Sequence, residues 1–115
     1  MDKENFIKEN DKIATALKKV SGSFGKIICV VDNKKKLLGI ITAGDIRRAI
    51  LAGNDPKDSI KKIYNKNVSY IFENEIINKK FVRSKFSNKE INQSIFYVPV
   101  VNEKKKVKNI LTTER

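Results

Sequence analysis

Two side chains near the middle of this 115-residue chain, Thr42 and Asp45, have the types and the spacing to bind a ligand. Thr42 precedes a stretch whose apolar residues recur at i, i+3 and i+4, so it stands where a helix begins. Unpaired backbone N–H groups and the positive end of the helix dipole favour an anion there. Asp45 lies one turn further, where a short carboxylate can accept hydrogen bonds from sugar hydroxyls. Spacing alone does not assign such a role to the pair, because an N-cap threonine and a first-turn acid need no ligand at all.

The stretch from Gly25 to Leu51 contains the elements that would position this pair. An apolar run rich in β-branched residues, a polar turn and a second apolar run indicate two strands. An amphipathic segment before them, with Asn10 or Asp11 as its N-cap, indicates a helix that ends near Gly22. The predicted strands span 26–31 and 37–41. The first predicted helix spans 12–20 and has Ile13, Leu17 and Val20 on one face. The second begins at Ala43 and has Ile46, Ala49 and Ile50 on one face.

The composition argues against a catalytic role. The chain has no histidine and one cysteine, which excludes histidine-based acid–base catalysis and the usual zinc sites. Cys29 lies inside an apolar run, so we expect a small buried residue rather than a nucleophile or half of a disulfide. We therefore expect a binding protein, not an enzyme.

The net charge of +12 is compatible with nucleic-acid binding or with a solvated basic surface. The lysines are scattered or lie in two turns, 34–36 and 104–106, and no aromatic residues alternate with them. The solvated surface is therefore the favoured interpretation. No apolar run is long enough to span a membrane, and residues 1–10 lack the apolar core of a secretory signal. A cytoplasmic location without membrane contact is the default expectation.

The segment 39–45, Gly-Ile-Ile-Thr-Ala-Gly-Asp, follows a Val-Val-Asp strand and a basic turn, and it resembles the most diagnostic motif of the CBS domain. That domain is a regulatory module named after cystathionine β-synthase. In the family, the threonine approaches the phosphate of an adenine nucleotide and the aspartate bridges the ribose hydroxyls. The resemblance implies these roles for Thr42 and Asp45. It also implies AMP, ADP, ATP or S-adenosylmethionine as a regulatory ligand, with no other cofactor required.

An internal repeat supports the resemblance. Residues 29–45 align without a gap on residues 99–115, and the match includes two valines, three lysines and a threonine in register. The second copy keeps the threonine as Thr112 but has Arg115 in place of the aspartate, and Glu114 stands one position early. The first half is therefore the better candidate for an occupied site.

The repeat and the motif together predict an α/β (α+β) fold, a tandem CBS-domain pair or Bateman module. Each half would be a small sheet packed against two helices, and the halves would be related by a pseudo-two-fold axis. We expect the first CBS motif to span 1–58 and the second to span 59–115. Two such modules commonly pair through their helices, so the resemblance also implies a homodimer.

The region that follows the first motif is predicted in less detail. Asp58 or Ser59 would cap a short helical turn, and a strand would follow over 68–72. Helical structure with a break is expected over 73–94. The second motif stops where its last helix should begin, which favours a fragment of a longer protein over a fold completed by a partner chain.

Further residues join the candidate site only through the resemblance. Ile28, Ile40 and Ile41 would line an adenine slot, although such residues form the core of any α/β domain. Arg47 is the nearer of two arginines that could meet a phosphate, ahead of Arg48, and a solvated helix face is the simpler interpretation. The predicted ligand-binding residues are Thr42, Asp45, Ile28, Ile40, Ile41, Arg47 and Thr112, with no catalytic residue and no metal ligand.

The resemblance implies a regulatory module that senses an adenine nucleotide and controls an attached or partner enzyme. The run 44–48, Gly-Asp-Ile-Arg-Arg, looks like a variant found in CBS pairs attached to sugar-nucleotide transferases and sugar-phosphate isomerases. One alternative is a structural or dimerisation segment that holds no ligand. A basic nucleic-acid-binding domain is the less favoured alternative.

Overall fold

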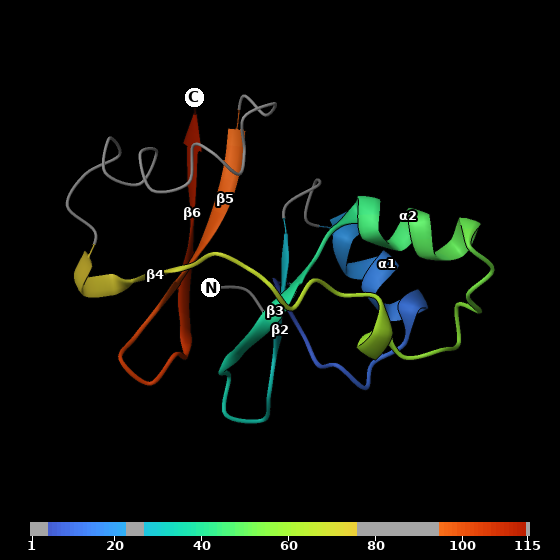
Figure 1. Cartoon of the computed structure of the whole chain (residues 1–115), viewed down its shortest axis with the longest axis horizontal. Coiled ribbons are helices and arrows are strands. Elements are labelled where there is room, and N and C mark those ends of the chain that lie inside the picture. Colours follow the sequence, from blue (N-terminus) through green and yellow to red (C-terminus); the bar gives the residue numbers. More distant parts are fainter. Residues whose placement is uncertain (1–4, 23–26, 76–94, 115) are drawn as a thin grey trace. The chain divides into compact units, whose positions relative to one another are not determined.

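The computed structural model describes residues 5–22, 27–75 and 95–114 (Figure 1). Its contacts divide the chain into two compact units, 1–68 and 69–115. The division by contacts falls after Val68, and the motif bounds 1–58 and 59–115 stay a prediction. The segment from Ile60 to Asn65 belongs to the first unit, because Ile60 contributes to the first core and Asn65 forms backbone hydrogen bonds with the first sheet.

The first unit contains a three-stranded sheet that follows from its two apolar runs. The strands are β1 (Phe6–Ile7), β2 (Ile28–Val31) and β3 (Leu37–Ile41), in the order β1-β2-β3. β1 runs parallel to β2, and β3 is antiparallel to it. All four residues of β2, the central strand, are buried, whereas β3 alternates between buried and half-buried residues.

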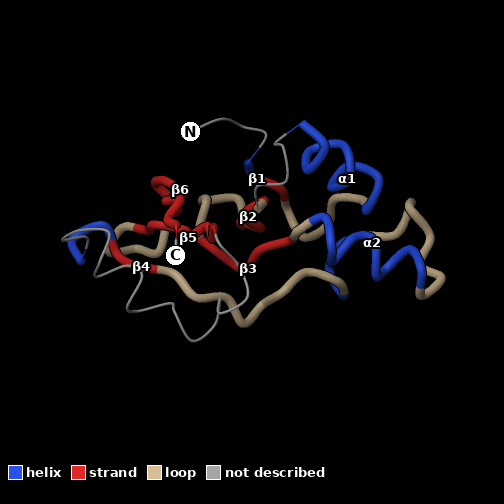
Figure 2. Tube along the Cα trace, turned by 90° about the horizontal axis from the view of Figure 1, so that it is seen from above, coloured by secondary structure: helices blue, strands red, loops and turns tan. Residues whose placement is uncertain are grey.

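Two helices pack beside each other on one face of this sheet (Figures 1 and 2). They are α1 (Ile13–Gly22) and α2 (Ala43–Leu51). Their buried aliphatic side chains meet those of β2 and β3, and burial of each such side chain contributes about 1.5–3 kcal/mol. The helical face of the core consists of Ile13, Ala16, Val20 and Ile46, and the sheet contributes Ile7, Ile28, Val30 and Ile41.

The predicted apolar faces of the helices are only partly correct. Ile13, Val20, Ile46 and Ala49 are buried, but Leu17 is 46% exposed and Ile50 is 40% exposed. Ala16 takes an inner position on α1 and is fully buried. Leu17 and Ile50 therefore lie at the outer edge of the helix pair.

The predicted N-cap of α1 is wrong. The carboxylate of Asp11 accepts a hydrogen bond from the backbone N–H of Lys8, so it closes a preceding turn and not the helix. The first N–H groups of α1 donate instead to backbone carbonyls of the segment after α2, Ile13 N to Asp58 O and Ala14 N to Pro56 O, both at 2.9 Å. A distant loop thus satisfies the helix start, which no local sequence pattern could indicate.

Two smaller predictions in the first unit are confirmed. Ser59 caps a short 3₁₀ helix, η2 (Ile60–Lys62), by accepting a hydrogen bond from the N–H of Lys61. Cys29 is fully buried, and burial raises the pKa of its thiol to about 12. Cys29 is therefore a packing residue.

The second unit has a sheet of the same topology. Its strands are β4 (Ile71–Phe72), β5 (Ile95–Val101) and β6 (Val107–Glu114), with β4 parallel and β6 antiparallel to β5. The predicted strand 68–72 is shorter than expected, and residues Glu73–Glu75 form a 3₁₀ helix, η3. The rest of the helical region predicted over 73–94 lies outside the described residues. No helix in the part of the chain that the structure describes is long and apolar enough to cross a membrane.

The hairpins β2–β3 and β5–β6 repeat each other residue by residue. The pairing register shifts between Val30 and Val31 in the first and between Val100 and Val101 in the second. Both turns hold a lysine in the left-handed region, Lys35 at φ 65° and Lys105 at φ 66°. Residues other than glycine rarely adopt this conformation. The gapless alignment read from the sequence therefore describes a repeated structure.

Candidate functional site

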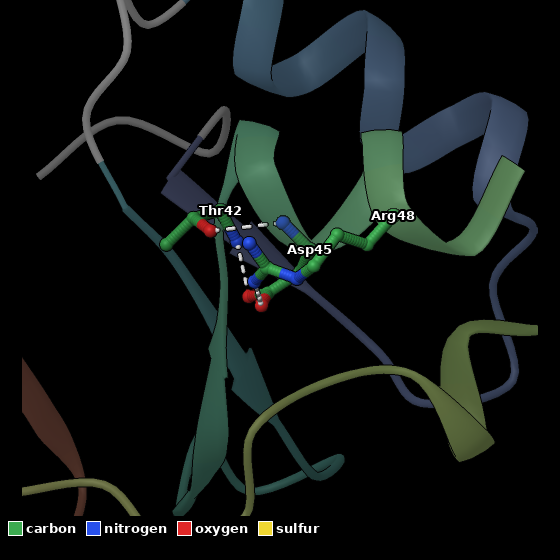
Figure 3. Close-up of polar contacts among 3 residues, drawn as sticks. All are labelled: Thr42, Asp45 and Arg48. Atoms are coloured by element: carbon green, nitrogen blue, oxygen red, sulfur yellow. Dashed lines mark hydrogen bonds and ion pairs between the residues drawn. The ribbon is translucent and has the colours of Figure 1, made fainter. Parts of the chain in front are cut away.

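Thr42 and Asp45 form a closed pair at the N-terminus of α2 (Figure 3). Thr42 is the N-cap, with extended backbone, and its Oγ1 accepts a hydrogen bond from Asp45 N at 3.2 Å. Asp45 Oδ2 in turn accepts from Thr42 N at 2.9 Å. This reciprocal capping box satisfies two backbone donors and fixes the direction in which the chain leaves β3 and enters the helix.

The second carboxylate oxygen of Asp45 also has a partner. Arg48 Nη2 donates to Asp45 Oδ1 at 2.6 Å, so the guanidinium reaches back one turn along α2 (Figure 3). The Asp45 side chain is 18% exposed and that of Arg48 is 70% exposed. Both oxygens of the Asp45 carboxylate therefore accept hydrogen bonds, and the Arg48 side chain that donates one of them is largely exposed to solvent.

Arg48 is the residue that reasoning from the sequence placed second. Arg47 was expected to be the nearer arginine, but it lies along an apolar groove with Leu17 and Leu51. Arg48 reaches Asp45 because residues three apart share one face of a helix, whereas residues two apart do not. The i, i+3 spacing of Asp45 and Arg48 was the available signal.

The three predicted isoleucines divide between the core and the opposite face of the sheet. Ile28 and Ile41 are fully buried, pair with each other across the strands and belong to the core beneath the helices. Ile40 points to the other face and is half-buried. The core interpretation is therefore correct for Ile28 and Ile41, and only Ile40 presents part of its side chain outside the core.

Thr112, the counterpart of Thr42, lies in a different local structure. It is within β6 and pairs with Tyr97, and the strand continues to Glu114. The structure therefore shows Thr42 at the start of a helix and Thr112 inside a strand.

A cavity of about 580 Å³ lies at the other end of the first sheet. Its lining includes Phe6 of β1, Lys8 directly after β1, and Asp32 and Lys35 of the turn between β2 and β3. None of the predicted ligand-binding residues lines it. Within residues 5–22, 27–75 and 95–114, no cluster of three or more Cys, Asp or Glu side chains could hold a metal ion.

The comparisons with known proteins support the predicted family and fold. The model of the CBS domain family matches residues 1–52. The solved structure of the CBS domain pair of protein MJ0100, in complex with 5′-methylthioadenosine and S-adenosyl-L-methionine, is 34% identical, with a TM-score of 0.74. The match covers 93% of this chain and 79% of that one. The chain belongs to the CBS-domain family.

Two more distant structures share the fold of this CBS pair. Protein MJ1225 from Methanocaldococcus jannaschii, described as a putative archaeal homolog of g-AMPK, is 19% identical with a TM-score of 0.72; the match covers 93% of this chain and 42% of that one. The CBS domains of a transcriptional regulator from Streptococcus pneumoniae are 18% identical with a TM-score of 0.71, covering 93% and 81%. The comparison with curated proteins gave no match.

Proposed function

We propose that this CBS pair is a regulatory module that binds an adenine nucleotide at Thr42 and Asp45. The observation that carries the proposal is the Thr42–Asp45 pair at the start of α2, where a hydroxyl, a carboxylate and the positive end of the helix dipole lie together. The complex of the MJ0100 domain pair with two adenosine compounds supports the same class of ligand here.

Each residue has a distinct part in this proposal. The hydroxyl of Thr42 and the N–H groups of the first turn of α2 face the ligand phosphate. Asp45 accepts hydrogen bonds from the ribose hydroxyls through Oδ1, which lies outside the capping box and which Arg48 also contacts. Ile40 contributes apolar surface to the adenine, and Arg47 is a secondary contact.

Regulation requires that the ligand prefer one conformation of the module. A ligand that binds two conformations equally shifts neither, so the nucleotide must stabilise one arrangement of the protein over another. The controlled activity belongs to an attached or partner enzyme in the cytoplasm. The Gly-Asp-Ile-Arg-Arg run of residues 44–48 favours a sugar-nucleotide transferase or a sugar-phosphate isomerase for that role.

Isothermal titration with AMP, ADP, ATP, S-adenosylmethionine and 5′-methylthioadenosine tests the proposal. We expect saturable binding of at least one of them, and at least tenfold weaker binding by Asp45→Asn, because loss of a charge-assisted acceptor costs about 1.5–3 kcal/mol. Asp55→Asn is the matched control, since Asp55 is exposed and its carboxylate accepts a hydrogen bond from the backbone N–H of Lys57 in its own turn.

A null result has a defined meaning. If none of the five compounds produces heat or raises the melting temperature, the proposal is wrong and the structural alternative is favoured. The self-satisfied capping box is compatible with that alternative, because it closes the helix start without a ligand.

We also propose that two copies of the module pair through their helices. An apolar groove runs along the outer side of α1 and α2, lined by Leu17, Ala43, Ile46, Arg47, Ile50 and Leu51. Leu51 is 80% exposed, and Leu17 and Ile50 are about half as exposed. Three large aliphatic side chains on one face favour a second apolar surface, and a second copy offers one of the same chemistry.

A further inference from the structure

Arg48 contacts the oxygen of Asp45 that a bound ribose would use. Its Nη2 lies 2.6 Å from Asp45 Oδ1, while Oδ2 is held by Thr42 N. Each oxygen of an ionised carboxylate can accept more than one hydrogen bond, so a ribose hydroxyl would share Oδ1 with the guanidinium and weaken its contact. Any adenosine compound at this site therefore binds beside Arg48.

The local backbone is shaped to admit the guanidinium. A Cβ added to Gly44 would lie 3.2 Å from Arg48 Nη1 and 3.7 Å from Thr42 Oγ1. Arg48 thus lies against the first turn of α2, over the one residue there that has no side chain. A Cβ at this position would require the end of the Arg48 side chain to shift by a few tenths of an ångström, so glycine permits the close contact seen here.

The energetic consequence depends on the charge of the ligand. An exposed ion pair is weak, so its loss alone is a small penalty. A guanidinium beside the N-terminus of α2 is, however, well placed for a phosphate, which it can bind with two parallel N–H···O bonds. A nucleotide supplies that phosphate, whereas a nucleoside or a sulfonium compound does not.

We propose that Arg48 makes this site selective for phosphorylated adenosines over uncharged or cationic ones. The residue closes over Asp45 when the site is empty and transfers to the ligand phosphate when the site is filled. This inference rests on the proposed function, since it assigns a ligand class to the same site. It also predicts a preference different from the two compounds in the MJ0100 complex, neither of which carries a phosphate.

Titration of AMP and adenosine into the wild type and Arg48→Ala tests the inference. In the variant, we expect AMP to bind roughly tenfold more weakly, because one charge-assisted contact is lost, and adenosine to bind about threefold more tightly, because its ribose no longer shares Oδ1 with the guanidinium. The ratio of the two affinities therefore changes by more than an order of magnitude. A general loss of structure would instead weaken both ligands together.

Lys18→Ala is the control for charge, because Lys18 is an exposed cation on α1. We expect this variant to leave the ratio of the two affinities unchanged. If both ligands bind but the ratio is the same in wild type and Arg48→Ala, the selectivity inference is wrong and the proposed function stands. If neither ligand binds any of the proteins, the proposed function fails and the inference fails with it.

Discussion

Tyr64 shows how a single side chain connects distant parts of the first unit. It is buried against Gly39 of β3, and its hydroxyl donates to Glu9 Oε2 at 3.0 Å across 55 residues of sequence. Burial, followed by the hydrogen bond and charge of Glu9, raises the pKa of Tyr64 to about 12. The surroundings of Tyr64 therefore favour the neutral phenol, because a phenolate there would be poorly solvated and would face the carboxylate of Glu9.

This raised pKa predicts a loss of stability in alkaline solution. Below an unfolded-state pKa of about 10, both states are protonated and the contact of Tyr64 is fully present. Between about pH 10 and about pH 12 the unfolded state loses the proton first, so the free energy of unfolding falls. Urea unfolding at several pH values should show a steeper decline for the wild type than for Tyr64→Phe.

The Phe variant also serves as the control for the general alkaline effect, because it retains every lysine. At neutral pH, we expect it to be less stable by about 0.5–1.5 kcal/mol through loss of one hydrogen bond. Parallel declines of the two proteins above pH 10 would show that Tyr64 is not the group responsible.

At the scale of elements, β3 is paired along both edges at Ile40. β2 lies on one side, and on the other Ile40 N donates to Asn65 O at 3.0 Å while Asn65 N donates to Ile40 O at 2.9 Å. The crossing segment passes directly over Gly39, where an added Cβ would lie 2.2 Å from Asn65 O and 2.7 Å from the Tyr64 ring. Gly39 is therefore required by close approach and not by its backbone angles.

Gly39→Ala should destabilise the first unit by about 1–3 kcal/mol, because the crossing segment must move away from β3. The repeat offers a matched position, Asn109, which is exposed and whose Oδ1 accepts only from the adjacent Ile110 N. We expect Asn109→Ala to change stability by less than about 0.5 kcal/mol. Chemical unfolding followed by circular dichroism measures both, and equal effects of the two substitutions would contradict the steric argument.

The elements that local patterns specify could be predicted from the sequence, and the contacts between distant segments could not. The hairpin and the helix start at Thr42 follow from alternation, turn residues and the change of period. The backbone partners of Ile13 and the crossing at Asn65 depend on how separate segments pack, which leaves no local trace. Of the site, the Thr42–Asp45 pair was predictable, whereas the choice of Arg48 over Arg47 depended on the phase of α2.

At the scale of the whole molecule, the two units share a backbone plan and differ in chemistry. In each unit, the ammonium of the turn lysine with positive φ lies over an aromatic ring. Lys35 Nζ is 5.7 Å from the ring centre of Phe6 in β1, and Lys105 Nζ is 5.1 Å from that of Tyr70, directly before β4. Asn102 stands in the second turn where Asp32 stands in the first. The Oδ1 atom of each accepts hydrogen bonds from the backbone N–H groups two and four residues further along the chain. The repeat thus conserves what shapes the hairpin, while the threonine–aspartate pair occurs in the first copy alone.

The apolar groove on α1 and α2 predicts self-association of the module. Burial of one leucine side chain contributes about 1.5–3 kcal/mol, so a charged substitution in the groove should weaken a dimer at least tenfold. We expect the wild type to sediment as a dimer, and Leu51→Glu to shift it toward monomer. Because Leu51 is 80% exposed, the substitution should leave the fold intact, which circular dichroism checks.

Lys61→Glu introduces the same side chain at an exposed position on η2, outside the groove, and should sediment like the wild type. A wild type that is monomeric at every concentration would exclude the dimer. A dimer that survives Leu51→Glu unchanged would place the interface elsewhere. If Leu51→Glu yields a monomer that still binds nucleotide, the ligand site is complete within one chain, and α2 is the element that carries both Asp45 and residues of the groove.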